Sequence, residues 1–275
     1  MKYSVIIPVF NEENVITKCL ESLAKQTVAK ETEVIVIDDG STDKTADKIN
    51  NFLLLRQKHA GPGAARNLGA EKARGEILIF ADADMEFAPD FLEKLTEPIR
   101  NGKTIGTFSK EEYLLNKNNP WARCWNLNLG RLAEKMHPDN YPDTQHVFRA
   151  ILKSKFEEAG GFDANIGYTD DWTLARKLGT MAVVAPGAKY YHRNPESPGE
   201  VWRQARWFGK NEFLTGNTVR KFYNLWRYCP LLSVFKGAYG ALKFREPVCL
   251  PFKIIYDTAV SVSVLFSFFK EPKSK

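Results

Sequence analysis

The amino-acid sequence predicts an α/β fold with a mostly parallel sheet, helices on both of its faces, and a basic and apolar helical appendage at the C-terminal end. Three observations support this class. Apolar runs and amphipathic segments alternate over residues 1–110, which is typical of repeated β-α-β units. The apolar runs are almost uninterrupted, as expected for strands that are covered on both faces. The 275 residues are 44% hydrophobic and 26% charged, which is enough to bury a core without disulfides or a structural metal.

Strands and helices follow one another in the first part of the chain. Strands are expected over Ser4–Val9, Glu33–Ile37 and Glu76–Ala81. Helices are expected over Glu12–Gln26, from Gly40 to Asn51, from Gly61 to Arg74 and from Pro89 onward. The first of these helices has apolar residues at helical spacing, and Gly75 is the expected stop of the third. Ligands of such sheets bind beyond the carboxyl ends of the strands.

The later elements are less regular. A helix is expected over Trp121–Lys135 and a strand over Met181–Ala185. Ser197-Pro198-Gly199-Glu200 is a good helix start, because it places a serine cap, a proline at the first position and a glutamate at the capping-box position. From about Cys229 onward the apolar content rises, and we interpret this stretch as the appendage.

The cysteines and the N-terminal residues indicate the cellular compartment in which the protein is expected. Cysteines stand at positions 19, 124, 229 and 249, with no C-x-x-C pair. This usage predicts reduced thiols in a reducing compartment, rather than a disulfide scaffold or a zinc ribbon. The chain runs from Met1 straight into the first strand without the features of a signal peptide. We therefore expect a cytoplasmic protein.

The positive charge is concentrated in one segment. The formal net charge is +6, and residues 199–246 contain nine Lys/Arg against three Glu. The remainder of the chain is balanced. A local basic zone predicts an anionic partner, such as the phosphates of a substrate, lipid headgroups or nucleic acid.

Two acidic pairs follow strands of the predicted sheet. Asp38-Asp39 comes after the second strand, and Asp82 and Asp84 come after the strand that ends at Ala81. For one pair alone, a turn or a cap of the next helix explains the residues equally well. Two pairs on one edge repel each other unless a cation lies between them. Mg²⁺ or Mn²⁺ with a diphosphate would supply that charge.

Ordered motifs support this interpretation. They are Pro8-Val9-Phe10-Asn11-Glu12, Val36–Asp43, Gly63–Asn67, Asp82-Ala83-Asp84, Ala159–Asp163 and Thr169–Trp172. Taken together, they resemble the family 2 glycosyltransferases, which have the GT-A (Rossmann-like) fold. The resemblance covers about residues 3–215 and implies a GT-A domain over 1–215. Its nucleotide-binding half would span about 1–110, its acceptor-binding half about 111–215, and the helical C-terminal region 216–275.

The resemblance implies roles for individual residues. Nucleotide-sugar contacts are expected from Pro8, Val9, Phe10, Glu12, Asp39, Arg66, Asp82, Ala83, Asp84, Arg203 and Arg206. Within this set, Asp82 would contact the ribose, Asp84 would ligate the metal, and Arg203 or Arg206 would steady the departing diphosphate. The family motif around Arg206 is Q-x-x-R-W, and Gln204-Ala205-Arg206-Trp207 is one residue short of it.

Further roles concern the acceptor and the metal. Asp171 would be the catalytic base, and Asp170 and Trp172 would contact the acceptor. Asp170 stands where many members have Glu. His192 would be a further metal ligand. On spacing alone, the two aspartates equally well cap the following helix, and a lone histidine is more often a packing residue.

The segment Val248–Phe269 is strongly apolar but contains Lys253 and Asp257. Its uncharged part is too short to span a bilayer. With basic residues upstream, it is typical of a helix lying on anionic lipid. The alternatives are a helix that packs on its own domain and a strand over Ala259–Leu265.

These observations predict an inverting glycosyltransferase that uses Mn²⁺ or Mg²⁺ and a UDP- or GDP-sugar. It would act on a lipid-linked or glycan acceptor, peripherally at the anionic cytoplasmic face of the cell membrane, and without nucleic acid. A nucleotidyltransferase would need a glycine-rich loop with a lysine after the first strand, where this chain has Phe10-Asn11-Glu12. A non-catalytic RNA-binding module would leave the acidic pairs unexplained.

Overall fold

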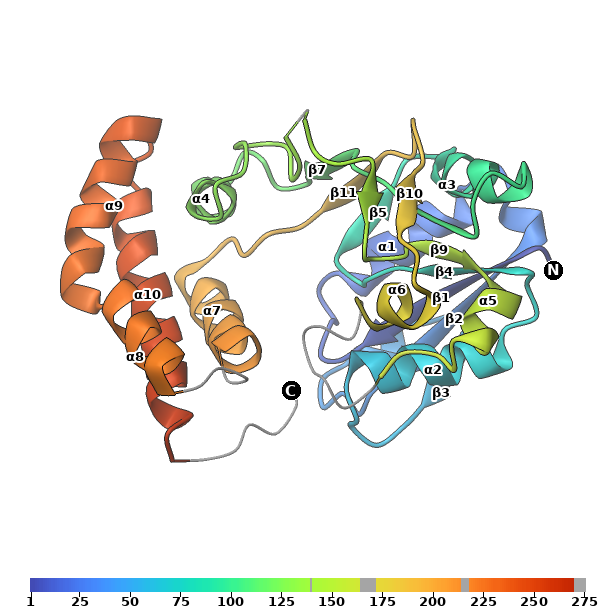
Figure 1. Cartoon of the computed structure of the whole chain (residues 1–275), viewed down its shortest axis with the longest axis horizontal. Helices are drawn as coiled ribbons and strands as arrows, with labels where there is room; N and C mark the ends of the chain where they lie inside the picture. Colours follow the sequence, from blue (N-terminus) through green and yellow to red (C-terminus); the bar gives the residue numbers. More distant parts are fainter. Residues whose placement is uncertain (139, 164–171, 214–217, 270–275) are drawn as a thin grey trace. The chain divides into compact units, whose positions relative to one another are not determined.

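The computed structural model describes residues 1–138, 140–163, 172–213 and 218–269 (Figure 1). They form two compact units. Unit 1 comprises Met1–Tyr113 and Asp139–His192, and unit 2 comprises Leu114–Pro138 and Arg193–Lys275. This division differs from the boundary near residue 215 that the sequence suggested. Residues 114–138 and the helix after Ser197 pack with the C-terminal helices, so they belong to unit 2.

Unit 1 is built on an eight-stranded sheet with the order β3-β2-β1-β4-β9-β6-β10-β8. The strands are β1 (Tyr3–Val9), β2 (Thr32–Asp38), β3 (Leu53–Arg56), β4 (Ile77–Phe80), β6 (Gly106–Phe108), β8 (Thr144–Gln145), β9 (Ala150–Leu152) and β10 (Ala182–Val184). The pairs β2-β3, β1-β2, β1-β4 and β6-β10 are parallel, whereas β9 runs antiparallel to both β4 and β6. The α/β class with a largely parallel sheet is confirmed.

Helices cover both faces of this sheet. On one face, α1 (Ile16–Ala24) and α3 (Phe91–Arg100) pack on a cluster that includes Val5, Ile7 and Ile79. On the other, α2 (Pro62–Lys72), α5 (Lys153–Glu158) and α6 (Thr173–Leu178) pack on Ile6 and Leu78. The alternation along β1 and β4 therefore buries residues on both sides, which explains their continuous apolar sequence.

Helix α2 lies unusually close to the sheet. A Cβ at Gly69 would come within 2.5 Å of Ile6 Cγ2 and 2.7 Å of Ile37 Cδ1. Only glycine fits at this position without displacing the side chains of these two isoleucines. The close approach brings the start of α2 toward the carboxyl ends of β1 and β2.

The prediction of a helix between Gly40 and Asn51 is wrong. Only a 3₁₀ turn, η2 (Ala46–Lys48), forms there; a second, η1 (Ala29–Glu31), precedes β2. Side-chain oxygens take the backbone N–H groups that a helix would need: Asp38 accepts from Ser41, Asn11 from Thr42, and Asp43 from Thr45. Such local bonds compete with helix formation.

Helix α1 is shorter than the expected Glu12–Gln26 for the same reason. The Glu12 N–H donates to Thr45 Oγ1 and the Glu13 N–H to Asp43. The segment before Ile16 is thereby tied to the loop after β2 and does not join the helix.

A small second sheet completes unit 1. It has the order β5-β11-β7, formed by β5 (Met85–Phe87), β11 (Tyr190–His192) and β7 (Glu112–Leu114). Strand β11 runs antiparallel to β5, with His192 opposite Met85. This pairing brings His192 next to Asp84, although the two residues are 108 positions apart in the sequence.

Unit 2 is helical. It contains α4 (Pro120–Asn128), α7 (Pro198–Phe213), α8 (Thr218–Arg227), α9 (Pro230–Phe244) and α10 (Cys249–Phe266). The start of α7 at Pro198 agrees with the capping signal, since Ser197 Oγ accepts from the Glu200 N–H at 3.3 Å. Helix α4 ends before the expected Lys135.

Helix α10 is the centre of unit 2. Its residues Phe252, Tyr256 and Val260 are buried in a cluster with Trp125 and Val201. Its length and composition would suffice to cross a membrane, but half of the helix is buried in the structure. The strand alternative for Ala259–Leu265 is wrong, because these residues are helical. Of the interpretations weighed for this segment, packing on the domain describes α10.

The prediction of four reduced thiols is corrected as well. Cys124 and Cys249 form a disulfide with an S–S distance of 2.13 Å, while Cys19 and Cys229 are free. The two bonded cysteines are 125 positions apart in sequence and are brought together only by the packing of α4 on α10. No local spacing of cysteines in the sequence predicts this disulfide.

Candidate active site

Acidic residues gather at the carboxyl ends of neighbouring strands. Asp38 and Asp39 lie at the end of β2, and Asp82 and Asp84 follow β4. Because β1 pairs in parallel with both β2 and β4, these ends lie on one edge of the sheet. This is the edge at which α/β sheets bind ligands.

Asp39 organises the loop before α2. Its buried carboxylate accepts from Gln57 Nε2 at 2.7 Å and from the N–H groups of Ala60 and Gly61 at 2.8 and 2.9 Å. His59 Nδ1 lies 2.9 Å from the same carboxylate. Asp38 likewise accepts from a turn N–H. The turn interpretation therefore holds for this pair, with Asp39 shaping the loop beside the strand ends.

The Pro8–Glu12 turn lies beside this loop. Phe10 stacks on His59 with ring centroids 4.4 Å apart. Asn11 has a positive φ of 58°, and its side chain accepts from the Thr42 N–H. Val9 is buried, while Pro8, Phe10 and Glu12 are half-buried. The result is an aromatic surface at the end of β1.

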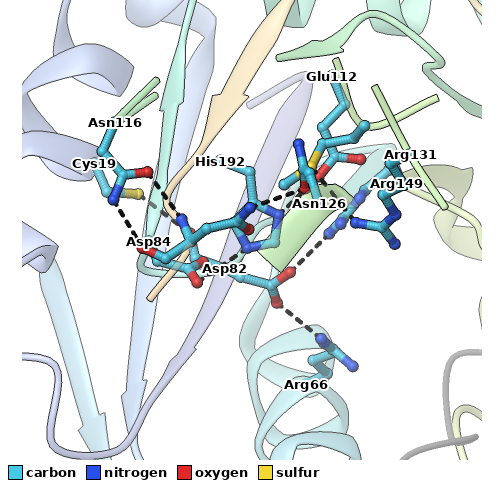
Figure 2. A network of polar contacts seen from close by, with 12 residues as sticks. Cys19, Arg66, Asp82, Asp84, Glu112, Asn116, Asn126, Arg131, Arg149 and His192 are labelled. Carbon is cyan, nitrogen blue, oxygen red and sulfur yellow. Dashed lines mark hydrogen bonds and ion pairs between the residues drawn. The ribbon is translucent and has the colours of Figure 1, made fainter. Parts of the chain in front are cut away.

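Asp82 lies between two arginines. Arg66 Nη2 donates to one carboxylate oxygen at 2.9 Å and Arg149 Nη1 to the other at 3.0 Å, as Figure 2 shows. Burial raises the pKa of Asp82, but the two guanidinium charges outweigh it and hold this pKa well below its usual range. Asp82 is therefore an ionised carboxylate with two firmly placed cations.

Arg149 was missed by the sequence analysis. It precedes β9, in a stretch whose elements are short, and its carbonyl oxygen accepts from the Phe80 N–H at 2.9 Å. The antiparallel pairing of β9 with β4 carries the side chain to Asp82. No pattern in the sequence indicates that pairing.

Asp84 meets His192, as Figure 2 also shows. His192 Nε2 lies 3.0 Å from Asp84 Oδ2, and His192 Nδ1 lies 2.7 Å from Glu112 Oε1. Burial alone would lower the pKa of His192, but the two carboxylates outweigh it and raise this pKa well above its usual value. Sequence reasoning singled out Asp84 and His192 but missed Glu112, which the small sheet brings alongside.

The donor atoms at this point suit a hard divalent cation. Asp84 Oδ1 is buried and makes no hydrogen bond to the part of the chain that the structure describes. A carboxylate oxygen and an imidazole nitrogen are ligands that Mn²⁺ and Mg²⁺ accept. Among the described residues, no group of three or more His, Cys, Asp and Glu side chains is arranged as a metal site. The two side chains therefore fit a site that a ligand's oxygens complete.

The structure describes four of the remaining predicted residues, Ala83, Trp172, Arg203 and Arg206. Ala83 is buried between the two aspartates. Arg203 is exposed on α7 of unit 2, and Arg206 lies with its guanidinium 5.7 Å from the Phe266 ring. Trp172 is exposed and stacks on His146 with centroids 5.6 Å apart. Asp170 and Asp171 lie outside the described residues.

Comparison with known proteins assigns the chain to a protein family. The profile of the family "Glycosyl transferase family 2" matches residues 4–160, more than half of the chain. A poly(ribitol-phosphate) beta-N-acetylglucosaminyltransferase, TarS of Staphylococcus aureus, is 43% identical over 105 residues, 35% of this chain and 18% of the relative. A poly(ribitol-phosphate) beta-glucosyltransferase of Bacillus spizizenii is 42% identical over 94 residues, 30% of this chain and 15% of the relative. The matches thus span less than a fifth of these two relatives.

Solved structures share the fold over most of the chain. The crystal structure of S. aureus TarS 1-349 in complex with UDP has a TM-score of 0.55 at 20% identity, covering 97% of this chain and 92% of that one. The mannosyltransferase PcManGT from Pyrobaculum calidifontis, in complex with GDP-Man and Mn²⁺, has a TM-score of 0.60 at 19% identity, covering 96% and 87%. With the strand order and the edge of acidic residues described above, the conclusion is that this chain belongs to glycosyl transferase family 2.

Proposed function

We propose that this protein is an inverting glycosyltransferase that moves a sugar from a nucleoside-diphosphate sugar to an acceptor hydroxyl. The observation that carries the proposal is the arrangement after β4. There Asp82 is held between Arg66 and Arg149, and Asp84 lies against His192 with a buried oxygen that makes no hydrogen bond to described residues. Such a set of charges is suited to a nucleoside diphosphate and a cation.

A UDP- or GDP-sugar is the proposed donor. Solved relatives of low sequence identity contain UDP, UDP-GlcNAc or GDP-Man, which supports this donor class. The Phe10–His59 stack offers an aromatic surface for the base. Pro8, Val9, Glu12 and Asp39 would shape the same end of the pocket. Asp82 would accept a ribose hydroxyl, and the Arg66 guanidinium would face the diphosphate.

Asp84 and His192 would hold Mn²⁺ or Mg²⁺. A bound cation would neutralise the negative charge that develops on the departing diphosphate. The presence of Mn²⁺ with GDP-Man in PcManGT supports this proposal. Glu112 would keep His192 Nδ1 engaged, so that Nε2 faces the cation. Arg203 or Arg206 would add positive charge to the leaving group.

The acceptor side rests on the sequence motif. We propose that Asp171 takes the proton of the acceptor hydroxyl as that oxygen attacks the anomeric carbon, because an alcohol is a poor nucleophile at neutral pH. Asp170 and Trp172 would hold the acceptor. A lipid-linked or glycan acceptor is proposed, and the curated relatives named for poly(ribitol phosphate) support that class.

The proposed location is the cytoplasmic face of the cell membrane, at an anionic surface. The Cys124–Cys249 disulfide is unusual for a reducing compartment. Alkylation of thiols in cells lysed directly into denaturant, which also exposes the buried Cys19, tests the location. Four alkylated cysteines would agree with a cytoplasmic protein, and two would contradict it.

Thermal melting with nucleotides tests the proposal. UDP or GDP with Mn²⁺ should raise Tm, because a ligand that binds only the folded state stabilises it. Asp84→Asn should weaken the Mn²⁺-dependent part of nucleotide affinity by roughly tenfold or more. The matched control is Asp47→Asn, an exposed aspartate of unit 1. Equal Mn²⁺ dependence in both variants would overturn the proposed metal site.

The proposed base has its own test. Asp171→Asn should abolish sugar transfer, while UDP or GDP binding and Tm stay close to those of the unmodified protein. The anomeric configuration of the product is read by NMR. A variant that keeps substantial transfer, or a product that retains the donor's configuration, would exclude this mechanism.

A further inference from the structure

Helices α8 and α9 of unit 2 each expose a stripe of large apolar side chains. On α8 the stripe is Val219, Phe222, Tyr223 and Trp226, and on α9 it is Leu231, Phe235, Tyr239 and Leu242. These eight side chains are between 53% and 81% exposed. Their spacings of three, four and seven residues place each set on one face of its helix. Exposed apolar surface of this extent marks an interaction site.

A cavity of about 540 Å³ lies beside these stripes. Its walls come from the end of α4 and from α8, α9 and α10 of the same unit; they include Asn128, Leu129, Trp226, Arg227, Tyr228, Leu232, Phe235, Lys236, Lys253 and Tyr256. Trp226 and Phe235 belong to both the cavity and the stripes. The cavity therefore borders the exposed apolar stripes.

Three cations line this cavity: Arg227, Lys236 and Lys253. Lys253 Nζ lies 2.9 Å from Asp257 and donates to Asn128 at 2.8 Å, so its charge is balanced. Lys236 donates to the carbonyl oxygen of Arg227. Neither Lys236 nor Arg227 forms a salt bridge within the described part of the chain. The cavity thus carries a net positive charge beside aromatic walls.

The combination of apolar and positively charged surface indicates which partner binds α8 and α9. A free phosphate would need the cations but would leave eight large apolar side chains in water. A bilayer with anionic lipids matches both, because its surface attracts cations and apolar side chains are stabilised on entering the acyl boundary. More cations follow along the same helices, at Arg220, Lys221 and Lys243.

We propose that the α8–α9 surface docks on an anionic membrane, with the cavity receiving the phosphate of a lipid headgroup. Arg227 and Lys236 contact the phosphate, and the two stripes enter the boundary between headgroups and acyl chains. This assignment rests on the proposed membrane location. It moves the contact from α10, whose central residues are buried in unit 2, to α8 and α9, which both pack on α10.

Vesicle flotation of the full chain tests the surface. The protein should float with vesicles of equal parts phosphatidylglycerol and phosphatidylcholine, and not with phosphatidylcholine alone. Replacing Arg227 and Lys236 by Gln should weaken binding by about fivefold per cation. The double substitution Leu231→Gln and Phe235→Gln should weaken it by roughly tenfold or more.

Two controls match these substitutions. Leu132→Gln changes an exposed leucine of unit 2 outside the stripes, and Lys103→Gln changes an exposed lysine of unit 1. Both should float like the unmodified protein. All changed side chains on α8 and α9 are exposed or at a cavity wall, and Tm of each variant verifies folding.

The remaining outcomes each decide the proposal. Equal flotation with neutral and anionic vesicles, or none, overturns it. Raised Tm with glycerol phosphate but no flotation shows a pocket for a soluble phosphate instead. A dimer in sedimentation that the Phe235→Gln substitution dissociates shows that a second copy covers the stripes. Nucleotide-induced shifts in Tm are measured on the same samples, so failure of the donor site is seen separately from failure of docking.

Discussion

His192 lies between two carboxylates, that of Glu112 on β7 and that of Asp84, the residue just before β5. Its Nδ1 faces Glu112 and its Nε2 faces Asp84. A histidine held in this way presents one nitrogen in a fixed direction, which is the arrangement that metal-ligating histidines use. Glu112 is nearly buried and therefore acts through His192 rather than on a ligand of its own.

The substitution Glu112→Gln tests this positioning role. The amide keeps the size of the side chain but not its charge, so His192 is held less firmly. We expect the Mn²⁺-dependent affinity for the nucleotide to fall by about tenfold or more, with Tm changed little. Titration of Mn²⁺ at fixed UDP or GDP, followed by thermal melting, measures this. Unchanged Mn²⁺ dependence would show that Glu112 only packs.

Between elements, Glu33 on β2 ties together three segments of unit 1. Its carboxylate accepts from Ser4 Oγ on β1 and from the backbone and guanidinium of Arg74, which precedes β4. Ser4 Oγ in turn accepts from the Gly75 N–H. Burial raises the pKa of Glu33, but these hydrogen bonds and the Arg74 charge outweigh it and lower the pKa below its usual value.

The lowered pKa predicts a pH-dependent contribution to stability. Because the folded state favours the ionised form, the contribution is present above the unfolded pKa and is lost as pH falls through the folded pKa. Glu33→Gln should cost about 1–2 kcal/mol of unfolding free energy at neutral pH and progressively less in acid. Urea unfolding across this pH range measures it. The control Glu31→Gln, at an exposed residue, should cost less than about 0.5 kcal/mol; a pH-independent cost of Glu33→Gln would contradict the argument.

Over the whole molecule, the chain forms unit 1, then part of unit 2, returns to unit 1, and ends in unit 2. The disulfide joins the two separate segments of unit 2, because Cys124 lies on α4 and Cys249 at the start of α10. Crosslinking residues 125 positions apart removes much of the freedom of the unfolded chain.

Loss of this crosslink should destabilise unit 2. Cys249→Ser should lower the free energy of unfolding by about 2–4 kcal/mol under oxidising conditions. The matched control is Cys229→Ser, which changes a free cysteine of the same unit. Denaturant unfolding with and without reductant measures both. If reductant lowers the stability of Cys249→Ser as much as that of the unmodified protein, the disulfide is not the cause.

Several features of the site follow from the sequence itself. Continuous apolar strands predict the parallel part of the sheet, and aspartates after the strands predict which edge is charged. Asp82 and Asp84 follow β4 directly, so their place needs only the local order of the chain. Motif resemblance identified His192 as well. The predictions of the sheet and of its charged edge are confirmed because they depend on short-range patterns and on the rule that parallel strands share an edge; the roles of Asp82, Asp84 and His192 stay predictions.

Only the tertiary structure determined which side chains contact Asp82, His192 and Cys124. Arg149 and Glu112 come from short strands whose pairing has no sequence signal, and Cys124 meets Cys249 only through the packing of α4 on α10. The helix expected after Gly40 does not form, because the side chains of Asn11 and Asp43 accept hydrogen bonds from the N–H groups of Thr42 and Thr45. Such bonds compete with those of a helical backbone. In the C-terminal region, apolar composition alone pointed to α10 as the surface helix. The packed structure buries its centre and leaves the stripes of α8 and α9 exposed, because which apolar face is covered depends on the neighbours a helix finds after folding.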